Sequence, residues 1–407
     1  MFPVKRAVYG ENGAMTEVQR YDVVVVGLGA MGSSTAYHLA RRGVRVLGLE
    51  QFTPAHDRGS SHGETRIVRQ AYFERPDYVP MLRRAYELWD ELSAEFGEQL
   101  LTRCGALMLG HRDSAVVAGT LASARQWGLP HEELDAAAVR SRFPQFAVPD
   151  DHVAVFEANA GFVRPEAAVL ASIELAIDAG AELWFDTEVE ELSLADGGVH
   201  LVAGGTEILA ERAVLATGAW AGSVLGETAL ARSAELGIEV SRQSVHWYEP
   251  VAGPSALPDF APLPVFLWEW PDGAGGTREI YGFPYLEGDS GVKVSLYKDG
   301  GPADPRSLDR TVTDADARTL EPLLARCLPG LAGRRVRGIA CMYAGVPDDD
   351  FVLGLHPASS GRIVLALGFS GHGFKFMPVV GEIAADLALS GRTELDIDFL
   401  SPERLGL

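Results

Sequence analysis

The stretch YDVVVVGLGAMGSSTAYHLARRGVRVLGLE, residues 21–50, constrains the fold more than any other part of the chain. It begins with a β-branched run, Val23–Val26, of the kind that forms buried parallel strands. We expect the helix that follows to end at Gly43 and a second strand to cover Val44–Leu49. Between the first strand and the helix lies a G-x-G-x-x-G motif, made of Gly27, Gly29 and Gly32. Strand, motif, helix and strand in this order predict a dinucleotide-binding βαβ unit.

Each glycine of the motif has a physical task. They allow a tight turn, a close approach of the backbone to a pyrophosphate, and close packing of the helix on the strand. The helix N-terminus then presents free N–H groups and partial positive charge to the phosphates. Glu50, 18 positions after Gly32, can accept hydrogen bonds from a ribose diol and would repel the extra phosphate of NADP. The motif by itself does not choose between FAD and NAD.

The C-terminal stretch GRIVLALGFSGHGFKFMPVVGEIAADLALSG, residues 361–391, favours FAD. It predicts a strand over Ile363–Leu367, a glycine-rich loop, and a helix from about Val379 to Leu389. This unit would bring a second helix N-terminus and Lys375 to the cofactor. A flavin has a use for such groups because its reduction places negative charge on the pyrimidine end. Ordinary α/β turns with capping glycines remain the alternative.

The composition limits the partners. The chain has 35 Lys and Arg against 56 Asp and Glu, a formal charge of −21. Such a surface repels nucleic acids and anionic membranes, and an acidic substrate would need a local cationic pocket. No apolar run approaches the roughly 20 residues of a membrane span. We therefore expect no nucleic-acid partner and no membrane partner, while the oligomeric state is not indicated.

The cysteines and the N-terminus bear on the cellular compartment. The three cysteines, Cys104, Cys327 and Cys341, form no disulfide framework, and no metal-ligand cluster stands out. This pattern favours a reducing, cytoplasmic compartment and no metal. The first 20 residues lack the apolar segment of a signal peptide, so we expect a flexible extension, with Met15 as an alternative start.

Three further regions indicate how the rest is organised. Residues 78–97, YVPMLRRAYELWDELSAEFG, have apolar side chains at helical spacing and predict a helix packed on a core. Residues 239–250 and a meander from Val265 to Lys298 alternate aromatic and β-branched runs with glycine-rich turns, which predicts an antiparallel sheet. A strand within residues 212–222 runs into a tight turn that suits packing beside a dinucleotide.

We therefore expect a mixed α/β fold, in which a Rossmann-like FAD-binding domain carries an inserted antiparallel-sheet substrate domain. After the extension over residues 1–20, the FAD-binding domain would be discontinuous and cover 21–100, 155–225 and 335–407. The substrate domain, which would also carry catalytic residues, would cover 101–154 and 226–334.

Five short stretches follow one another along the chain: GSSHGETRIVRQAY, YGFP, GVKVSLY, CMYAGVPDDDF and GFSGHGFKF. The first contains Arg66 and Arg69, which on a helix would share a face and by themselves would be a solvated basic surface. Together the five stretches resemble the monomeric sarcosine oxidase and N-methyltryptophan oxidase family of flavoenzymes. The likeness runs from about residue 21 to the C-terminus.

The resemblance implies a role for each matching residue. Cys341 matches the cysteine that links covalently to the flavin; its alternative is an inert buried thiol. Lys293 matches the lysine at which oxygen is reduced; its alternative is an outward-pointing strand lysine. Arg69 and Lys375 match the pair that holds the substrate carboxylate. The other matches to the substrate cavity are Tyr281, Tyr343 and His372, of which His372 could also be a plain loop histidine. The implied flavin contacts are Gly27, Gly29, Met31, Gly32, Glu50, Ser60, Ser61, His62, Thr65, Arg66, Val189, Gly218, Trp220, Cys341, Met342, Gly371, Gly373, Phe374 and Lys375.

The substrate surroundings depart from the family's pattern. Ser61 precedes His62 where relatives often have two histidines, and Gln70 and Tyr297 each stand in place of a histidine. A further histidine is replaced by Asp349 or Asp350, and we expect Trp268 and Trp270 to add bulk near the cavity. The type of reaction should therefore carry over better than the substrate.

The implied reaction is FAD-dependent oxidation of the C–N bond of a secondary or N-substituted amino acid, with N-substituted glycines favoured. Its products would be an imine that hydrolyses, and hydrogen peroxide from molecular oxygen. One alternative is another amino- or imino-acid oxidase on the same scaffold, of pipecolate type or acting on a cyclic imine. The others are a dehydrogenase that passes electrons to a protein or quinone, and a flavin-binding protein without catalysis.

Overall fold

The structure, a computed structural model, describes residues 18–226 and 236–407. The predicted extension and its alternative start at Met15 lie almost entirely outside this range. The first strand already begins at Gln19, so the last two residues of the predicted extension belong to it.

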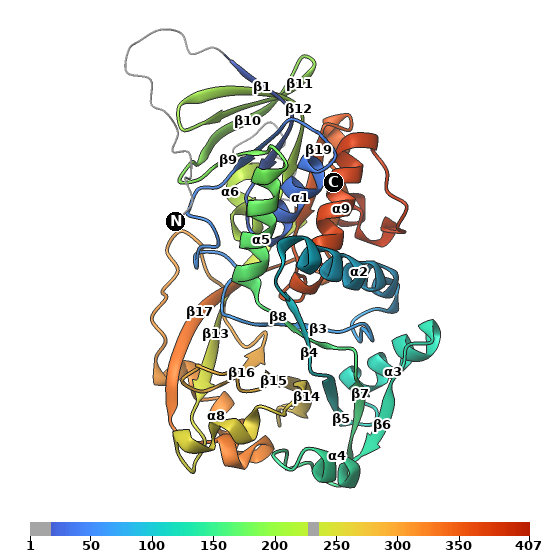
Figure 1. The fold of residues 1–407 in the computed structure, drawn as a ribbon, viewed down its shortest axis with the longest axis vertical. Coiled ribbons are helices and arrows are strands. Elements are labelled where there is room, and N and C mark those ends of the chain that lie inside the picture. The colour runs from blue at the N-terminus through green and yellow to red at the C-terminus, as the bar shows by residue number, and fades with distance from the viewer. Residues whose placement is uncertain (1–17, 227–235) are drawn as a thin grey trace.

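One large sheet is built around the predicted βαβ unit and lies in the upper half of Figure 1. Its central strands β9, β2, β1, β12 and β19 run parallel, and the hairpin β10–β11 and strand β18 add antiparallel neighbours. Strand β1 is buried between β2 and β12, as its β-branched run predicts. The strands are β1 (Gln19–Val26), β2 (Val46–Leu49), β9 (Glu182–Trp184), β10 (Val189–Ala195), β11 (Gly198–Ala203), β12 (Thr206–Leu215), β18 (Val352–Leu355) and β19 (Ile363–Leu367).

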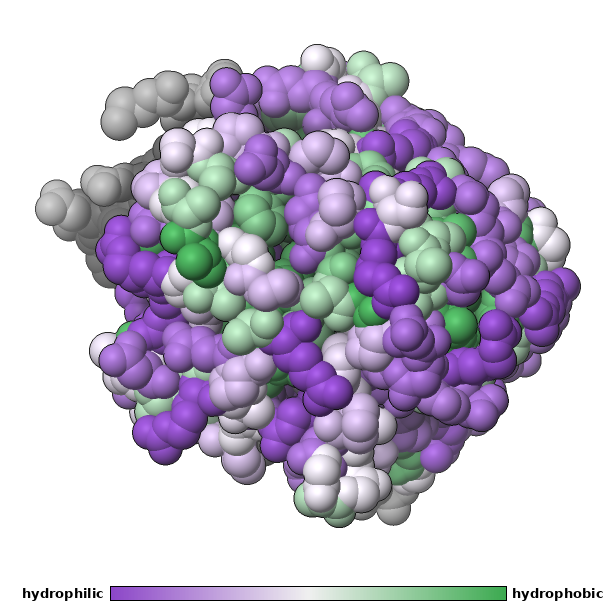
Figure 2. All heavy atoms as spheres, turned by 90° about the horizontal axis from the view of Figure 1, so that it is seen from below, coloured by the Kyte–Doolittle hydropathy of each residue, from purple (hydrophilic) through white to green (hydrophobic). Residues whose placement is uncertain are grey.

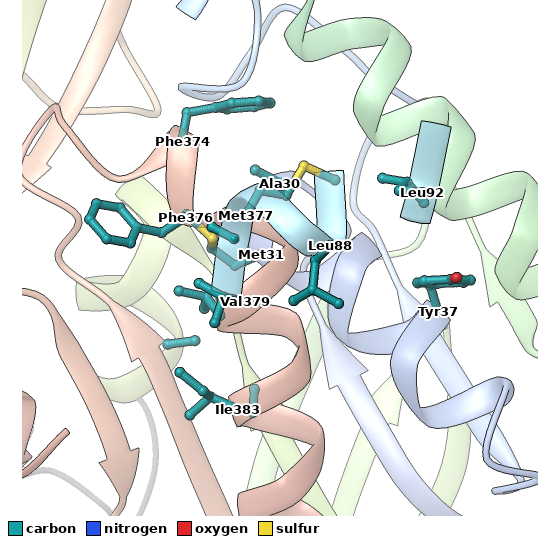
Figure 3. Close-up of a cluster of buried hydrophobic side chains, with 14 of the residues drawn as sticks. Ala30, Met31, Tyr37, Leu88, Leu92, Phe374, Phe376, Met377, Val379 and Ile383 are labelled. Atoms are coloured by element: carbon teal, nitrogen blue, oxygen red, sulfur yellow. The ribbon is translucent and has the colours of Figure 1, made fainter. Parts of the chain in front are cut away.

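Helices from distant parts of the chain pack around this sheet. Helix α1 (Ala30–Ala40) follows the glycine motif and packs against both α5 (Pro165–Asp178) and α9 (Met377–Ser390). Figure 3 shows side chains of α1, α9 and α2 (Val79–Phe96) meeting in one apolar cluster, with Met31 beside Met377. The C-terminal helix is thereby held next to the N-terminal βαβ unit.

A second sheet fills the lower half of Figure 1 in the order β17-β13-β16-β15-β14-β5-β7-β6. The predicted meander is β14, β15 and β16, and all neighbours are antiparallel except β14 and β5. The strands are β5 (Ala106–His111), β6 (Glu132–Asp135), β7 (His152–Glu157), β13 (Glu239–Tyr248), β14 (Val265–Pro271), β15 (Thr277–Gly282), β16 (Val292–Tyr297) and β17 (Arg335–Gly345). The helices of this part are α3 (Ala115–Trp127), α4 (Ala136–Arg142), α7 (Asp314–Ala317) and α8 (Leu320–Cys327), and α6 (Ala221–Gly226) follows β12.

A small sheet links the two large ones. It consists of β3 (Arg66–Val68), β8 (Gly161–Val163) and β4 (Leu101–Arg103), all antiparallel. Arg66 and Arg69 therefore lie on extended backbone, not on one helical face, because β3 pairs with β8 instead of coiling.

The predicted class, a mixed α/β fold with a Rossmann-like part and an inserted sheet, is confirmed. The domain boundaries stay a prediction. Strand β17 was assigned to the FAD-binding segments by sequence, but it pairs with β13 in the second sheet.

The surface carries mostly polar side chains. In Figure 2, which views the molecule from the end formed by the second sheet, apolar residues form small areas among hydrophilic ones. None of the helices that the structure describes is both long and apolar enough to cross a bilayer.

The contact between α1 and α9 gives a stability prediction. A Cβ added at Gly381 of α9 would lie 2.1 Å from the Ser34 Oγ and 2.6 Å from the Ser34 carbonyl carbon on α1. We expect Gly381→Ala to push the helices apart and lower the free energy of unfolding by about 1–3 kcal/mol, the usual cost of overpacking. Gly222→Ala is the control, since nothing lies within 4 Å of a Cβ there. Equal denaturation midpoints for the two variants would contradict this packing.

Candidate active site

A long groove starts at the glycine motif and runs toward the second sheet. It holds about 1400 Å³ of empty space, counting its open mouth. The predicted cofactor contacts that line it are Gly27, Gly29, Met31, Glu50, Ser60, Ser61, Arg66, Val189, Gly218, Trp220, Gly371, Gly373 and Phe374.

The motif glycines are required by the local packing. Gly27 has a φ of +88°, and a Cβ on it would lie 2.6 Å from the carbonyl oxygen of Ala216. A Cβ on Gly32 would lie 1.7 Å from the carbonyl oxygen of Gly27. The turn is tight because β12 ends directly beside it, with Ala216 N–H bonded to the Val26 carbonyl at 2.9 Å. The N-terminus of α1 therefore opens onto the groove without side chains in the way.

Glu50 closes the other side of this turn. Its carboxylate accepts hydrogen bonds from the backbone N–H groups of Leu28, at 2.9 Å, and Phe52, at 3.1 Å. The hydroxyl of Thr217, which lines the groove, is buried and has no hydrogen-bond partner among the described residues. Buried polar atoms of this kind are normally satisfied, so a polar ligand would complete the site. The groove thus fits a dinucleotide such as FAD.

A second cavity joins the groove where the two sheets approach each other. It encloses about 730 Å³, open space included, and shares Arg66, Tyr343, Gly371 and Phe374 with the groove. Of the residues predicted for the substrate or the flavin, it also contains Thr65, Arg69, Tyr281, Cys341, His372 and Lys375. These residues come from β3, β15, β17 and the loop before α9, four segments far apart in the sequence.

Arg66 and Cys341 meet at the junction of groove and cavity. One Arg66 amino group donates to the carbonyl of Ser60 at 2.8 Å and lies 3.8 Å from the Cys341 sulfur. Burial by itself would raise the pKa of the Cys341 thiol, but the neighbouring His62 and the Arg66 guanidinium lower it to about 7. A sulfur with such a pKa has substantial thiolate character, which is what a nucleophilic cysteine needs.

Lys293 lies behind the loop over residues 63–65 and lines neither cavity. Its ammonium donates to the carbonyls of Gly63, at 2.5 Å, and Thr65, at 3.0 Å, and to the Thr65 hydroxyl at 3.1 Å. It is 4% exposed. Burial, and then the charge of Arg66, hold its pKa well below the usual value for lysine.

Arg69 and Lys375 bring positive charge into the second cavity. One amino group of Arg69 donates to both carboxylate oxygens of Glu74, at 2.7 and 2.6 Å, and the guanidinium lies 4.4 Å from the centre of the Tyr72 ring. The Lys375 ammonium donates to the carbonyl of His372 at 2.6 Å. Burial and then repulsion by Arg69 lower the pKa of Lys375 to about 7. Burial favours the neutral form of Glu74, but Arg69 and the other nearby basic groups together outweigh it and lower the pKa of that carboxyl.

His372 lines this cavity, but both of its ring nitrogens are engaged. Nδ1 pairs with the Tyr72 hydroxyl, and Nε2 lies 3.0 Å from the carbonyl oxygen of Asp349. Burial lowers the pKa of His372 to about 4, so the ring is neutral near pH 7. These two contacts hold the ring in place, and the backbone carbonyl of the same residue accepts from Lys375.

Some predicted residues lie elsewhere. Gly32, His62, Met342 and Lys293 line neither cavity, although His62 lies beside Cys341. The expectation that Trp268 and Trp270 crowd the cavity is wrong. The Trp268 indole donates to His152 at 2.9 Å in an apolar cluster on the opposite face of β14, whereas Leu267 lines the cavity. Alternation along the strand puts 267 on one face and 268 and 270 on the other.

Other residues of the site were missed by the sequence reasoning. Glu74 and Gln243 line the second cavity, and Glu166 holds the loop beside Lys293. Glu74 could have been found from the sequence, because an acidic residue five positions after Arg69 can pair with it. Gln243 and Glu166 could not, because they lie on a distant strand and a distant helix. The part of the chain that the structure describes contains no group of three or more side chains able to hold a metal ion.

The sequence profile of one protein family, described as FAD dependent oxidoreductase, matches residues 22–387. The chain belongs to this family. The match covers the groove, the second cavity and most of α9, so the FAD dependent oxidoreductase assignment rests on the whole of the described site.

Individual members of the FAD dependent oxidoreductase family are similar along nearly the whole chain. Monomeric sarcosine oxidase of Streptomyces avermitilis is 44% identical over 390 residues, which cover 95% of this chain and 98% of that protein. N-methyl-L-tryptophan oxidase of Salmonella heidelberg is 36% identical over 388 residues, with 95% and 98% coverage. The resemblance predicted from the five short stretches is thereby confirmed.

Solved structures have the same fold. NikD, an unusual amino acid oxidase essential for nikkomycin biosynthesis, superposes with a TM-score of 0.79 at 26% identity, covering 95% of this chain and 98% of its own. L-proline dehydrogenase from P. horikoshii has the same TM-score and the same coverage at 23% identity, which supports the fold alone. The chain is an FAD-dependent oxidoreductase.

Proposed function

We propose that this enzyme oxidises the C–N bond of a secondary or N-substituted amino acid, with N-substituted glycines favoured, and reduces molecular oxygen to hydrogen peroxide. One observation carries the proposal. Two buried cations, Arg69 and Lys375, line the same cavity as Cys341 and Tyr343, and this cavity opens into the FAD groove. A small acid held by the cations would thus lie next to the end of the groove.

The cation pair offsets the repulsion between an acidic protein and an acidic substrate. The chain's formal charge of −21 repels anions at long range, so local positive charge has to outweigh it. Each charge-assisted hydrogen bond to a carboxylate contributes about 1.5–3 kcal/mol. Glu74 already accepts two hydrogen bonds from one amino group of Arg69. A substrate carboxylate therefore has to replace Glu74 in one or both of these hydrogen bonds.

When bound, FAD supplies the two-electron acceptor that takes a hydride equivalent from the carbon beside the nitrogen. The amine has to be neutral at that moment, because its lone pair forms the C=N bond of the imine as the hydride leaves. Tyr281, Tyr343, Leu267 and Phe283 line the cavity and exclude water from the reacting carbon. The imine then hydrolyses in water to an amine and a carbonyl compound.

We assign the oxygen half of the reaction to Lys293. Its ammonium is buried and lies among the carbonyls of the 63–65 loop, which also borders the cavity through Thr65. A fixed positive charge in such a dry place stabilises the negative charge that develops as oxygen takes up electrons. The acceptor would then be oxygen and not a partner protein.

We also propose that FAD is covalently attached through Cys341. The thiol lines the second cavity, next to the junction with the groove, and its lowered pKa supports a role as the nucleophile. The sulfur would replace a hydrogen on the ring system, the electron pair of the broken C–H bond would leave the flavin reduced, and molecular oxygen would reoxidise it. The division into an FAD-binding part (21–100, 155–225 and 335–407) and a substrate part (101–154 and 226–334) belongs to the same proposal. So does a cytoplasmic location, which fits three unpaired cysteines.

The function is tested with a panel of amines. We expect N-substituted glycines to produce hydrogen peroxide and to bleach the flavin when oxygen is absent, whereas amines without a carboxylate should do neither.

Lys293→Met should slow reoxidation of the reduced enzyme by at least about 100-fold, since a preorganised charge is lost. Reduction by substrate should change little. Oxygen uptake unchanged in Lys293→Met would rule out this oxidase mechanism.

The covalent link is tested by acid precipitation. The yellow colour of the native enzyme should stay in the pellet, and Cys341→Ser should release it into the supernatant. Cys104→Ser is the matched control and should keep the colour in the pellet, because Cys104 lines neither cavity. Colour in the supernatant of the native enzyme would show that the flavin is not attached.

The pKa of Lys375 predicts how pH affects binding of a carboxylate inhibitor. The ammonium form binds the carboxylate, and its pKa in the free enzyme is about 7. Affinity should therefore be complete below pH 7 and fall as the pH rises through 7, by up to tenfold per pH unit. Lys375→Arg should remove this dependence, because a guanidinium keeps its charge. Titration of the flavin absorbance with inhibitor between pH 6 and 9 measures it; a flat profile in the native enzyme would contradict the assignment.

A further inference from the structure

Lys293 is held by a loop whose backbone adopts an unfavourable conformation. Three of its hydrogen bonds go to Gly63 and Thr65. Gly63 has a φ of +100° and Glu64, which is not a glycine, a φ of +72°. Backbone of this kind is unfavourable at a non-glycine residue and persists only where neighbours hold it.

The neighbour that holds it is Glu166, in the first turn of α5. One carboxylate oxygen accepts from the N–H of Gly63 at 2.6 Å and from the N–H of Glu64 at 3.1 Å, and the other lies 3.3 Å from the Glu64 nitrogen. Two successive N–H groups thus point at one anion, while the carbonyl of Gly63 points the other way, at the Lys293 ammonium. The carboxylate is well placed at a helix N-terminus.

Glu166 also acts on Lys293 through its charge. Burial and the nearby Arg66 disfavour the ammonium form, and the Glu166 carboxylate is the largest influence that favours it. Arg66 is fixed by the same loop, through hydrogen bonds to the carbonyls of Ser60 and Thr65 at 2.8 Å. The carboxylate therefore both shapes the loop and offsets the positive charge on its far side.

We propose that Glu166 is a positioning residue for the oxygen half-reaction: it fixes the 63–65 loop so that Lys293 is held as a cation at one place. This inference rests on the proposed role of Lys293. It assigns to α5, a helix that supplies none of the predicted catalytic residues, control over how fast reduced enzyme reacts with oxygen. Glu166 itself would touch neither substrate nor cofactor.

The test compares Glu166→Gln with Glu174→Gln in the holoenzyme. Glutamine keeps the size of the side chain but loses its charge and one acceptor. Glu174 lies about two turns further along α5, away from the loop, and its variant removes the same charge from the same helix. We expect Glu166→Gln to lower the rate constant for reoxidation by about tenfold, the usual effect of removing an outer partner of a functional group. Reduction by substrate should stay within twofold, and Glu174→Gln should match the native enzyme in both steps.

Two further readouts separate positioning from general damage. The reoxidation rate should fall with rising pH as Lys293 loses its proton, and in Glu166→Gln this fall should begin at lower pH, because the stabilising anion is gone. Glu166→Asp keeps the charge at a greater distance, so it should slow reoxidation while leaving the pH profile nearly in place. It also serves if Glu166→Gln does not fold. Hydrogen exchange at the amides of Gly63 and Glu64 should speed up in both Glu166 variants and not in Glu174→Gln.

A double-mutant cycle with Lys293→Met decides the assignment. If Glu166 acts through Lys293, Glu166→Gln should add nothing to the loss caused by Lys293→Met. An equal effect in both backgrounds, or no effect on reoxidation in the native background, would overturn the inference while leaving the proposed function intact. Unchanged reoxidation in Lys293→Met by itself would instead refute the role of Lys293 and the inference with it.

Discussion

The rest of the site depends on the hydrogen bonds that the Arg66 guanidinium donates to the loop before it. Its hydrogen bonds draw together the carbonyls of Ser60 and Thr65, and one amino group reaches the sulfur of Cys341 on β17. The loop comes from the chain that follows the first βαβ unit, whereas β17 belongs to the second sheet. Arg66 therefore links the FAD groove to the substrate cavity. Lys293 of β16 links the same loop to the second sheet through its own hydrogen bonds.

The same region concentrates positive charge inside an acidic protein. Arg69, Lys293 and Lys375 are each at most 5% exposed. Burying a charge is costly unless it is paired or hydrogen-bonded, and each of these groups is satisfied differently. Arg69 has a carboxylate, while the two lysines have backbone carbonyls and depressed pKa values. Lys375, with a pKa of about 7, therefore changes its charge near neutral pH, whereas for Lys293 burial disfavours the charged form.

Close packing of helices α1 and α9 supports this arrangement. The glycine at position 32 lets α1 lie against the first strand, and Gly381 lets α9 lie against α1. Because α9 follows directly on the loop that carries His372 and Lys375, its close seat on α1 sets where these two residues stand. Trp89 of α2 adds a hydrogen bond to the carbonyl of Lys375 at 3.0 Å. The position of Lys375 at the substrate cavity therefore depends on helix packing as well as on its own loop.

The sequence by itself determined the local elements and the family. The Val23–Val26 strand, the glycine motif, the strand at Ile363–Leu367 and the meander could all be read from periodicity and turn residues, because these signals are local. Element ends were less certain: β2 begins at Val46 and not Val44, and α9 begins at Met377 and not near Val379. Motifs shared with a known family supplied the candidate residues, whose roles remain predictions.

Only the tertiary structure decided which of them meet. The meeting of Arg69 and Lys375 in one cavity, the hold of Glu166 on the 63–65 loop, and the turn of Trp268 away from the cavity depend on strand register and on contacts between distant segments. A one-residue shift of a strand reverses its faces, and no local pattern encodes such contacts.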